Sequence, residues 1–353
     1  MKEKIIDYLL SHANPSIVLR VRKEVTKDLS KAEETSLLEK ILMNKNVITA
    51  VSSQRLDGWL GDYYHGSKNL FDNMEVGIRF LAEKGLPPEH PVIRNAALAS
   101  ANTKKWEAPF FETEAKFNPQ ADYLYPSWGI YLTRSSILIR AGYETILPQS
   151  EDMDLEYDIA FSLKSFLAVR DVHSPDEIQE MRRGKMCFRP DVLWPCIYHL
   201  RMLAFSYGWR TPEAVDALSN AISALYAFPK AEFTYIIYNG QLRGPCMPFV
   251  MNTSINETLR DGVVGGMYFD RLELFARCGA LTRVKELREE YALLLDHLDT
   301  QGRFVGEVNR KYALGWSPYF GFALEEDWRS KIRRQCDILF RVLMIMEWQE
   351  AMR

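Results

Sequence analysis

Signals that begin and end α-helices recur along the whole chain. Ser30 and Glu33 have the spacing of a capping box, in which each side chain bonds the backbone of the other residue. Asn14 stands before Pro15, an arrangement typical of a first helical turn. Apolar residues then return every three or four positions, which indicates helices buried on one face. Further helices are predicted at 72–85, 128–141, 154–169, 174–177 onward, 191–205, 211–227, 267–278, 283–298 and 325–352.

Strand signals are rare by comparison. The region 228–252 is the main departure from helical spacing, and within it 235–240 resembles a short strand followed by a turn. The predicted helices, joined by short turns, fit an open solenoid, a closed α/α toroid or an irregular bundle. The apolar stretch 338–348 must be covered on most sides, which favours closure. We therefore predict an all-α fold, an α/α toroid of helical hairpins around a central cavity. We expect one domain, 1–353, with 1–45 as a peripheral helical extension.

Composition narrows the classes of protein. The net charge of −3 provides no general basic field, so nucleic acid is not an expected partner. Asp7 interrupts the apolar start of the chain, which argues against a signal peptide, and no window reaches the roughly 20 apolar residues of a membrane span. The 5 cysteines form no CxxC pair, which predicts neither a disulfide framework nor a zinc site. We expect a cytoplasmic protein with no membrane span, cofactor or metal, and the sequence gives no oligomeric state.

Two turns carry aromatic and glycine residues in a recognisable order. The first, at 54–61, has Gln54 and Gly58 followed by Trp59, and the second keeps only Gly302 and Phe304. Both resemble the Q-x3-G-x-W turn of the squalene-cyclase and protein-prenyltransferase superfamily. The chain as a whole is similar to an uncharacterised bacterial branch of it. This resemblance implies an α/α toroid with an aromatic-lined cavity for an apolar, isoprenoid-like ligand.

The catalytic motifs of that superfamily are not matched. A cyclase would carry a D-x-D-D run, and the nearest segment, 152–155, ends in leucine. A D-D-x-x-D run for magnesium diphosphate is missing as well. The prenyltransferase zinc site needs Asp, Cys and His together, and the residues flanking Cys196 and His199 do not match it. The resemblance therefore concerns the fold and leaves the reaction open.

One glycine-rich loop combines carboxylates, a histidine and aromatic rings. Asp57, His65 and Asp72 are candidate catalytic residues, because a histidine beside a carboxylate can transfer protons near neutral pH. Trp59 and Tyr64 are candidate ligand contacts in the same loop. The structural alternative makes Asp57 a turn former, Asp72 a helix cap and His65 a solvated side chain.

A second candidate lies on a predicted helix. Cys196 and His199 are three residues apart and so share one face, where they could bind a metal or form an activated thiol. His199 is accordingly a catalytic candidate. Two ligands are short of a metal site, however, and free cysteine is among the most buried residue types. Packing in the core is the alternative.

Charged and aromatic residues near helix starts complete the candidates. The carboxylates at 325–327 are expected in the first turn of the last helix, where they suit the helix dipole. Aromatic residues also recur where helices begin, and such rings could line a cavity mouth or simply pack in the core. Four of these aromatic residues and one aspartate are candidate ligand-binding residues: Trp128, Trp194, Trp316, Tyr319 and Asp122.

Three functions remain open from the sequence. The first is a small-molecule binder or enzyme that uses an aromatic-lined toroid cavity. The second is a non-catalytic helical scaffold that binds a protein or peptide, and the third is a carbohydrate-active α/α enzyme with two cavity carboxylates. The first and third require polar candidates to converge in a pocket. We predict that the loop around Asp57, Trp59 and His65 lies at the rim of the same cavity as Trp128, His199 and Trp316.

Overall fold

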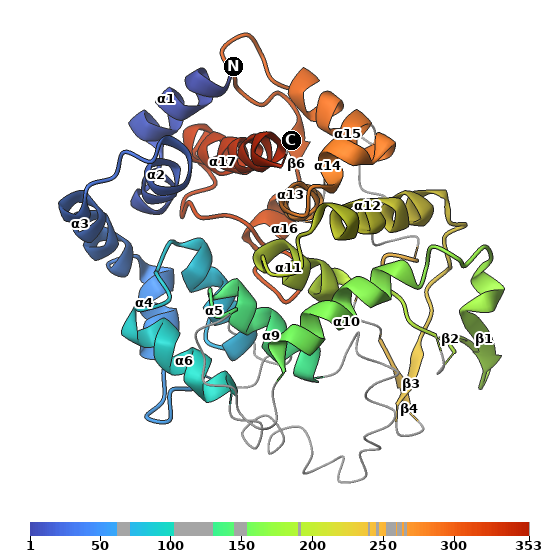
Figure 1. Ribbon diagram of the computed structural model, residues 1–353. Coiled ribbons are helices and arrows are strands. Elements are labelled where there is room, and N and C mark those ends of the chain that lie inside the picture. Colours follow the sequence, from blue (N-terminus) through green and yellow to red (C-terminus); the bar gives the residue numbers. More distant parts are fainter. Residues whose placement is uncertain are drawn as a thin grey trace. The chain divides into compact units, whose positions relative to one another are not determined.

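The computed structural model is mostly helical, which confirms the predicted class in its coarse form (Figure 1). The structure describes residues 1–61, 71–101, 130–144, 154–189, 192–238, 241–244, 247–251, 259, 263–264 and 267–352. Two compact units are present. The first comprises Met1–Ala99, Thr258–Thr282 and Leu287–Arg353, and the second comprises Ser100–Glu257 and Arg283–Glu286. The toroid and the single domain stay predictions.

Both ends of the chain contribute helices to the first unit. The amino-terminal part contains α1 (Lys2–His12), α2 (Pro15–Arg20), the π-helical turn η1 (Val21–Thr26), α3 (Lys31–Leu42), α4 (Lys45–Ser52), α5 (Met74–Glu83) and α6 (Pro91–Ala101). The carboxyl-terminal part contains α13 (Tyr268–Arg277), α14 (Ala280–Arg283), α15 (Lys285–Asp296), α16 (Arg310–Leu314) and α17 (Lys331–Ala351). Two short strands, β5 (Val263–Val264) and β6 (Glu307–Val308), pair in parallel. Helix α17 packs against both α1 and α13, which covers its apolar faces as expected.

The second unit combines helices with two hairpins. Its helices are α9 (Ile130–Arg140), α10 (Leu155–Leu167), the 3-10 turn η2 (Pro175–Glu177), α11 (Ile197–Phe205) and α12 (Pro212–Ala227). Helix α10 packs against α11 and α12, and α11 also packs against α9. The antiparallel pair of β3 (Ile236–Tyr238) and β4 (Gln241–Arg243) confirms the short strand predicted there, and residues 239–240, where the turn is predicted, lie outside the described residues. A second antiparallel hairpin, β1 (Gln179–Arg182) with β2 (Lys185–Phe188), was not expected from the sequence.

The helix caps explain most of the element boundaries. Asn14 accepts a hydrogen bond from the Ile17 N–H at 3.1 Å, and Ser30 forms the predicted capping box with Glu33. Helix α5 differs in detail: its cap is Asn73, whose side chain accepts from the Val76 N–H at 2.9 Å. The alternative reading of Asp72 as the cap was therefore wrong by one residue.

The start of the last helix also differs from the prediction. Helix α17 begins at Lys331, capped by Ser330, so the carboxylates at 325–327 precede the helix instead of forming its first turn. Glu325 is only 5% exposed. The residues between α16 and α17 form neither helix nor strand, although several are fully buried. Their backbone groups consequently need partners other than a regular helix, and the search for these partners leads to the candidate site.

Candidate functional site

The segment 315–329, here called the interior segment, is irregular backbone inside the first unit. Trp316, the residues 321–325 and Trp328 are all buried. Buried N–H and C=O groups almost always have hydrogen-bond partners. A segment that forms neither helix nor strand has no regular internal pattern of backbone hydrogen bonds to supply them. Backbone carbonyls supply some of the partners, and side chains from neighbouring helices supply several others. The candidate site is built from these contacts.

Helix α5 and the residue after it bind carbonyl groups of the interior segment. Arg79 donates to the carbonyl oxygens of Ser317 at 2.7 Å and Phe320 at 2.8 Å. Its guanidinium also lies 4.7 Å from the centre of the Trp316 ring, a cation–π arrangement. Lys84 donates from Nζ to the Leu324 carbonyl at 2.5 Å. Two cations, one on α5 and one directly after it, thus hold both halves of the segment.

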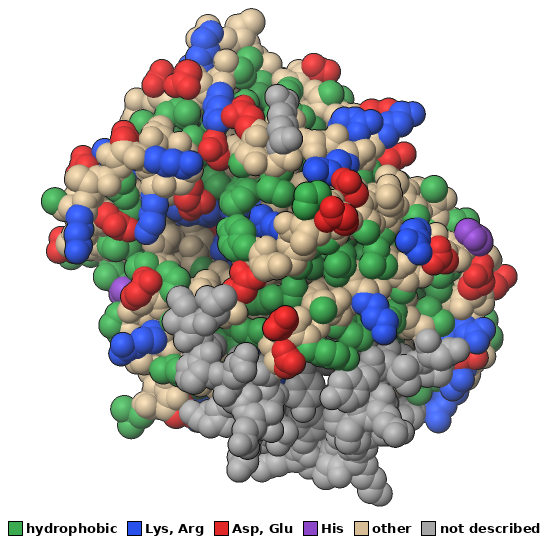
Figure 2. All heavy atoms as spheres, in the orientation of Figure 1, with side chains coloured by type: hydrophobic (Ala, Val, Ile, Leu, Met, Phe, Trp, Pro, Cys, Tyr) green, Lys and Arg blue, Asp and Glu red, His purple; other side chains and the backbone are tan. Residues whose placement is uncertain are grey.

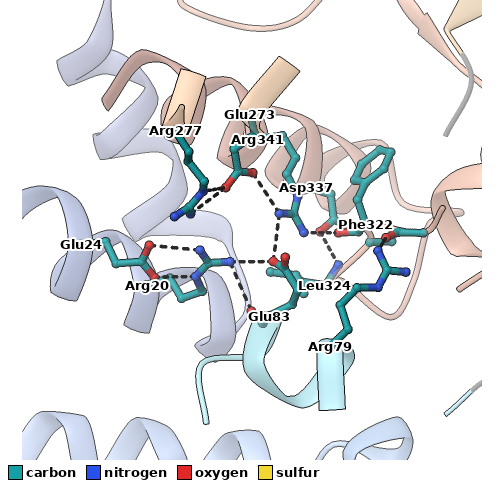
Figure 3. A network of polar contacts seen from close by, with 12 residues as sticks. Arg20, Glu24, Arg79, Glu83, Glu273, Arg277, Phe322, Leu324, Asp337 and Arg341 are labelled. Atoms are coloured by element: carbon teal, nitrogen blue, oxygen red, sulfur yellow. Dashed lines mark hydrogen bonds and ion pairs between the residues drawn. The ribbon is translucent and has the colours of Figure 1, made fainter. Parts of the chain in front are cut away.

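Helix α17 binds the middle of the same segment. Asp337 accepts from the backbone N–H of Leu324 at 2.6 Å and from that of Glu325 at 3.1 Å, and it also accepts from the Trp328 indole at 2.6 Å. Arg341, one helical turn further on, donates to the Phe322 carbonyl at 2.9 Å. The Asp337 carboxylate thus accepts from N–H groups of the segment, and the Arg341 guanidinium donates to one of its carbonyl groups (Figure 3).

A chain of alternating charges lies behind these contacts (Figure 3). Arg341 contacts Glu83 at 2.9 Å and Glu273 at 3.3 Å, Arg20 contacts Glu83 at 2.8 Å, and Arg277 contacts Glu273 at 2.8 Å. Burial alone would lower the pKa of Arg20 and Arg341, but the neighbouring carboxylates outweigh it and keep both above their usual values. Arg20 and Arg341 therefore stay charged. Glu83 lies between Arg20 and Arg341, and Glu273 lies between Arg277 and Arg341. Such paired groups specify a packing arrangement and are not poised for proton transfer.

Two carboxyl groups of the site hold protons more tightly than usual. Burial, reinforced by the nearby charge of Asp337, raises the pKa of Glu325 to about 7. Burial raises the pKa of Asp337 to about 6, although the hydrogen bonds from Trp328, Leu324 and Glu325 oppose the shift. Burial likewise lowers the pKa of Lys84. At neutral pH, Asp337 is therefore mostly charged and accepts the hydrogen bonds described above, whereas Glu325 loses its proton near pH 7.

Stability should depend on pH through this pair. Both folded-state pKa values exceed the unfolded ones, so the folded protein keeps protons that the unfolded chain releases. The resulting stabilisation is complete below the unfolded values and is lost as the pH rises through about 6 and about 7. We expect Glu325→Gln to remove the share of Glu325, on the order of 3 kcal/mol, from this dependence.

Denaturant unfolding at pH values from below the unfolded pKa values to above about 7 measures this pH dependence of the unfolding free energy. Glu326→Gln is the matched control, because Glu326 is the exposed neighbour of Glu325. Its unfolding free energy should follow the wild-type pH profile. Parallel pH profiles for wild type and Glu325→Gln would show that Glu325 does not titrate differently in the folded state.

Two predicted ligand contacts belong to the interior segment. Trp316 is 2% exposed, its indole donates to the Ala323 carbonyl at 3.2 Å, and its ring meets Phe80 edge-on at 5.0 Å. Tyr319 is half-buried, and its backbone N–H donates to Ser317 Oγ at 3.2 Å. Trp316 is thus part of the packing of the segment, whereas Tyr319 retains accessible surface.

The predicted aromatic turn lies against the start of α5. Asp57 accepts from the Trp59 N–H at 3.1 Å, as a turn former does, and Trp59 is 4% exposed. Gly58 has φ +88°, and a side chain there would meet the Asn95 carbonyl at 2.6 Å, so only glycine fits. Gly61 bridges to Asn73, the cap of α5.

Asp72 is half-buried beside this turn. Its neighbour Phe71 packs on Phe80 at 4.3 Å and faces Trp316 at 6.4 Å between ring centres. The structure therefore brings the 54–61 turn, Asp72 and Trp316 together around α5. Catalytic roles for Asp57 and Asp72 stay predictions.

His199, Cys196 and Trp194 belong to the second unit. The Cys196 N–H donates to His199 Nδ1 at 3.0 Å at the start of α11, and His199 is fully buried. Burial lowers the pKa of His199 to about 3 and raises that of the Cys196 thiol to about 12. Trp194 stacks on Phe188 at 4.1 Å. A neutral imidazole and a protonated thiol are suited to packing, not to acid–base or nucleophilic chemistry near neutral pH.

The remaining candidates lie outside the described residues. These are Tyr64, His65, Asp122 and Trp128. The shared cavity rim therefore stays a prediction, and its described members fall into different units: Asp57, Trp59 and Trp316 in the first, His199 in the second. Within the described ranges, no three His, Cys, Asp or Glu side chains are grouped to hold a metal ion. No described helix has the length and apolar character needed to cross a membrane.

Sequence reasoning missed Arg79, Lys84, Asp337 and Arg341. A signal was present: Asp337 and Arg341 stand four residues apart in the otherwise apolar stretch 336–346, where charged side chains need buried partners. Comparison with protein-family models, with curated proteins and with solved structures finds no match to this chain. The case for a function consequently rests on the contacts described above.

Proposed function

We propose that this protein binds a small molecule against the interior segment, with Tyr319 as a direct contact and Trp316 as its support. One observation carries the proposal: irregular, buried backbone is held at fixed positions by Arg79, Asp337 and Arg341. Binding groups are commonly presented on irregular segments of a rigid frame, and fixing them beforehand reduces the entropic cost of binding.

The surroundings of the segment suggest the ligand class. Several of its polar backbone groups are bonded to side chains of α5 and α17, as described above, and Pro318, Tyr319 and Phe320 are half-buried. Aromatic and prolyl surface suits an apolar or planar molecule, in line with the isoprenoid-like class that the resemblance implies. A carbohydrate-active enzyme would instead need two carboxyl groups facing the substrate. Glu83 and Glu273 are both bonded to buried arginines, and Asp337 accepts from N–H groups of the segment, so these contacts do not favour that alternative.

Truncation of Tyr319 should separate binding from stability. We expect Tyr319→Ala to reduce the occupancy of a co-purified small molecule about tenfold while costing only about 1 kcal/mol of stability, since the side chain is half-buried. Native mass spectrometry of the freshly purified protein measures the bound mass, and thermal unfolding measures stability.

Tyr207→Ala is the control, because Tyr207 is a 56% exposed tyrosine outside the interior segment. It should retain the wild-type occupancy. A wild-type protein that carries no small molecule, or equal occupancy in Tyr319→Ala, would contradict the proposal. The scaffold alternative would then be favoured.

A further inference from the structure

Strand β1 of the second unit has an open outer edge. It pairs with β2 through residues 179–182 and 185–188, and within the described ranges it pairs with no other strand. Residues 181–185 are all exposed. The edge of a sheet presents backbone N–H and C=O groups that can pair with another chain. Strand β1 is therefore a template for one more strand, and its side chains decide which strand fits.

The hydrogen bonds at the base of the hairpin show which backbone groups of β1 point outward. The Arg189 N–H donates to the Ile178 carbonyl at 2.9 Å, so this opposed pair is hydrogen-bonded. Hydrogen-bonded and non-hydrogen-bonded pairs alternate along an antiparallel ladder. Met181 lies three positions after Ile178 and belongs to a non-hydrogen-bonded pair. Its N–H and C=O groups consequently point away from β2, toward the open edge.

Strand β2 shows the matching pattern on its other side. The Tyr235 N–H donates to the Met186 carbonyl at 2.8 Å, and the Phe188 N–H donates to the Tyr235 carbonyl at 2.8 Å. Met186 is the residue opposite Met181, so its carbonyl also points away from the hairpin interior. Strand β2 is thus bound on both edges and gives β1 a fixed support. Only the outer edge of β1 is open in this hairpin.

The side chains of β1 carry a charge pattern that is its own complement. Glu180 and Arg182 lie two residues apart on one face and pair at 2.6 Å, with side-chain exposures of 36% and 47%. Met181, between them, is 64% exposed on the other face. Charged side chains of both signs gather where β1 and β2 lie in Figure 2. A strand that presents a cation opposite Glu180 and a carboxylate opposite Arg182 fits this edge, and a second β1 does so when it runs antiparallel.

We propose that two copies of this chain associate through β1, with the strands antiparallel about a two-fold axis at Met181. The two Met181 residues exchange N–H···O=C bonds across the axis, and their side chains meet on one face. On the other face, each Glu180 keeps its own Arg182 and gains the Arg182 of the other copy, so that the four charges alternate. The contact is isologous and closed, because β2 leaves no second edge for a further copy.

Charge also selects the register of this pairing. A shift that sets Met181 opposite Gln179 would place the two Glu180 carboxylates directly opposite each other, which is unfavourable. The paired edge is short, and it buries less than the roughly 1,200 Å² of a stable interface. We therefore expect a weak, reversible dimer with a dissociation constant on the order of 0.1–1 mM.

Charge reversal tests the pairing between copies. Sedimentation equilibrium at low salt, at protein concentrations up to 0.5 mM on the scale of that constant, should show dimers for the wild type. Glu180→Arg alone and Arg182→Glu alone should each weaken the dimer about tenfold, because like charges then meet across the axis. An equimolar mixture of the two variants should recover dimers, as should one chain that carries both substitutions. Arg170→Glu, which reverses an exposed charge outside β1, is the control and should associate like the wild type.

Met181→Pro tests the backbone part of the contact. Proline removes the outward N–H of Met181, which β2 does not use, and edge strands accept proline. This variant should keep the wild-type circular dichroism and lose the dimer. A wild type that stays monomeric would overturn the proposal and show that the charges protect the edge from pairing. Dimers retained by Met181→Pro or by both single reversals would place the contact elsewhere, and a mixture that recovers nothing would show that Glu180 and Arg182 do not pair between copies.

Discussion

Replacing Arg341 with methionine should lower the free energy of unfolding by about 3–5 kcal/mol. Methionine fills a similar volume but leaves Glu83 and Glu273 without a shared cation and the Phe322 carbonyl without its donor. Arg341 is 2% exposed, so water cannot readily replace the lost contacts. An uncompensated buried charge is among the costliest consequences of a single substitution. Urea unfolding followed by circular dichroism measures the loss.

Arg170→Met is the control for this substitution. Arg170 pairs with Asp171 at the surface, and its loss should leave the unfolding curve unchanged. Combining Arg341→Met with Glu83→Gln tests the network itself. The double variant should be more stable than the sum of the single effects predicts, by about 1 kcal/mol or more, because the two residues are in contact. Strict additivity would show that the Arg341–Glu83 contact does not contribute.

The helices could be predicted because their signals are local. Asn14 with Pro15, and Ser30 with Glu33, act on backbone groups within one turn, so the sequence next to each helix suffices. The hairpin at 179–188 could not be predicted in the same way. Its turn uses Arg183 before Gly184 in place of the usual Asn, which removes the expected signal.

The start of α17 shows where local reasoning fails. The carboxylates at 325–327 and the basic residues after them fit a helix beginning there. In the structure, Asp337 accepts the N–H groups of Leu324 and Glu325 and keeps that backbone out of the helix. The competing partner lies twelve or more residues away, and helical periodicity carries no information about it.

The candidate site was predictable only in its aromatic part. Trp316 and Tyr319 are conspicuous because large rings stand in an irregular, proline-containing stretch. The charges on α5 are not conspicuous. Arg79 and Glu83 have the four-residue spacing of an exposed ion pair, and only the tertiary structure shows that both are buried.

Asp337→Asn should show how strongly the interior segment depends on a single carboxylate. One oxygen accepts from Leu324 N and Glu325 N, and the other accepts from Glu325 N and the Trp328 indole. An amide has only one acceptor oxygen, so in either orientation its NH₂ group faces a buried N–H donor. We expect a loss of about 3 kcal/mol, together with faster hydrogen exchange at the Leu324 and Glu325 amides. Asp327→Asn is the control, because Asp327 is exposed and caps the Arg329 N–H through one oxygen that asparagine retains. Equal stability of the two variants would mean that other contacts hold the segment, and Arg79 on α5 and Lys84 directly after it would then be its main anchors.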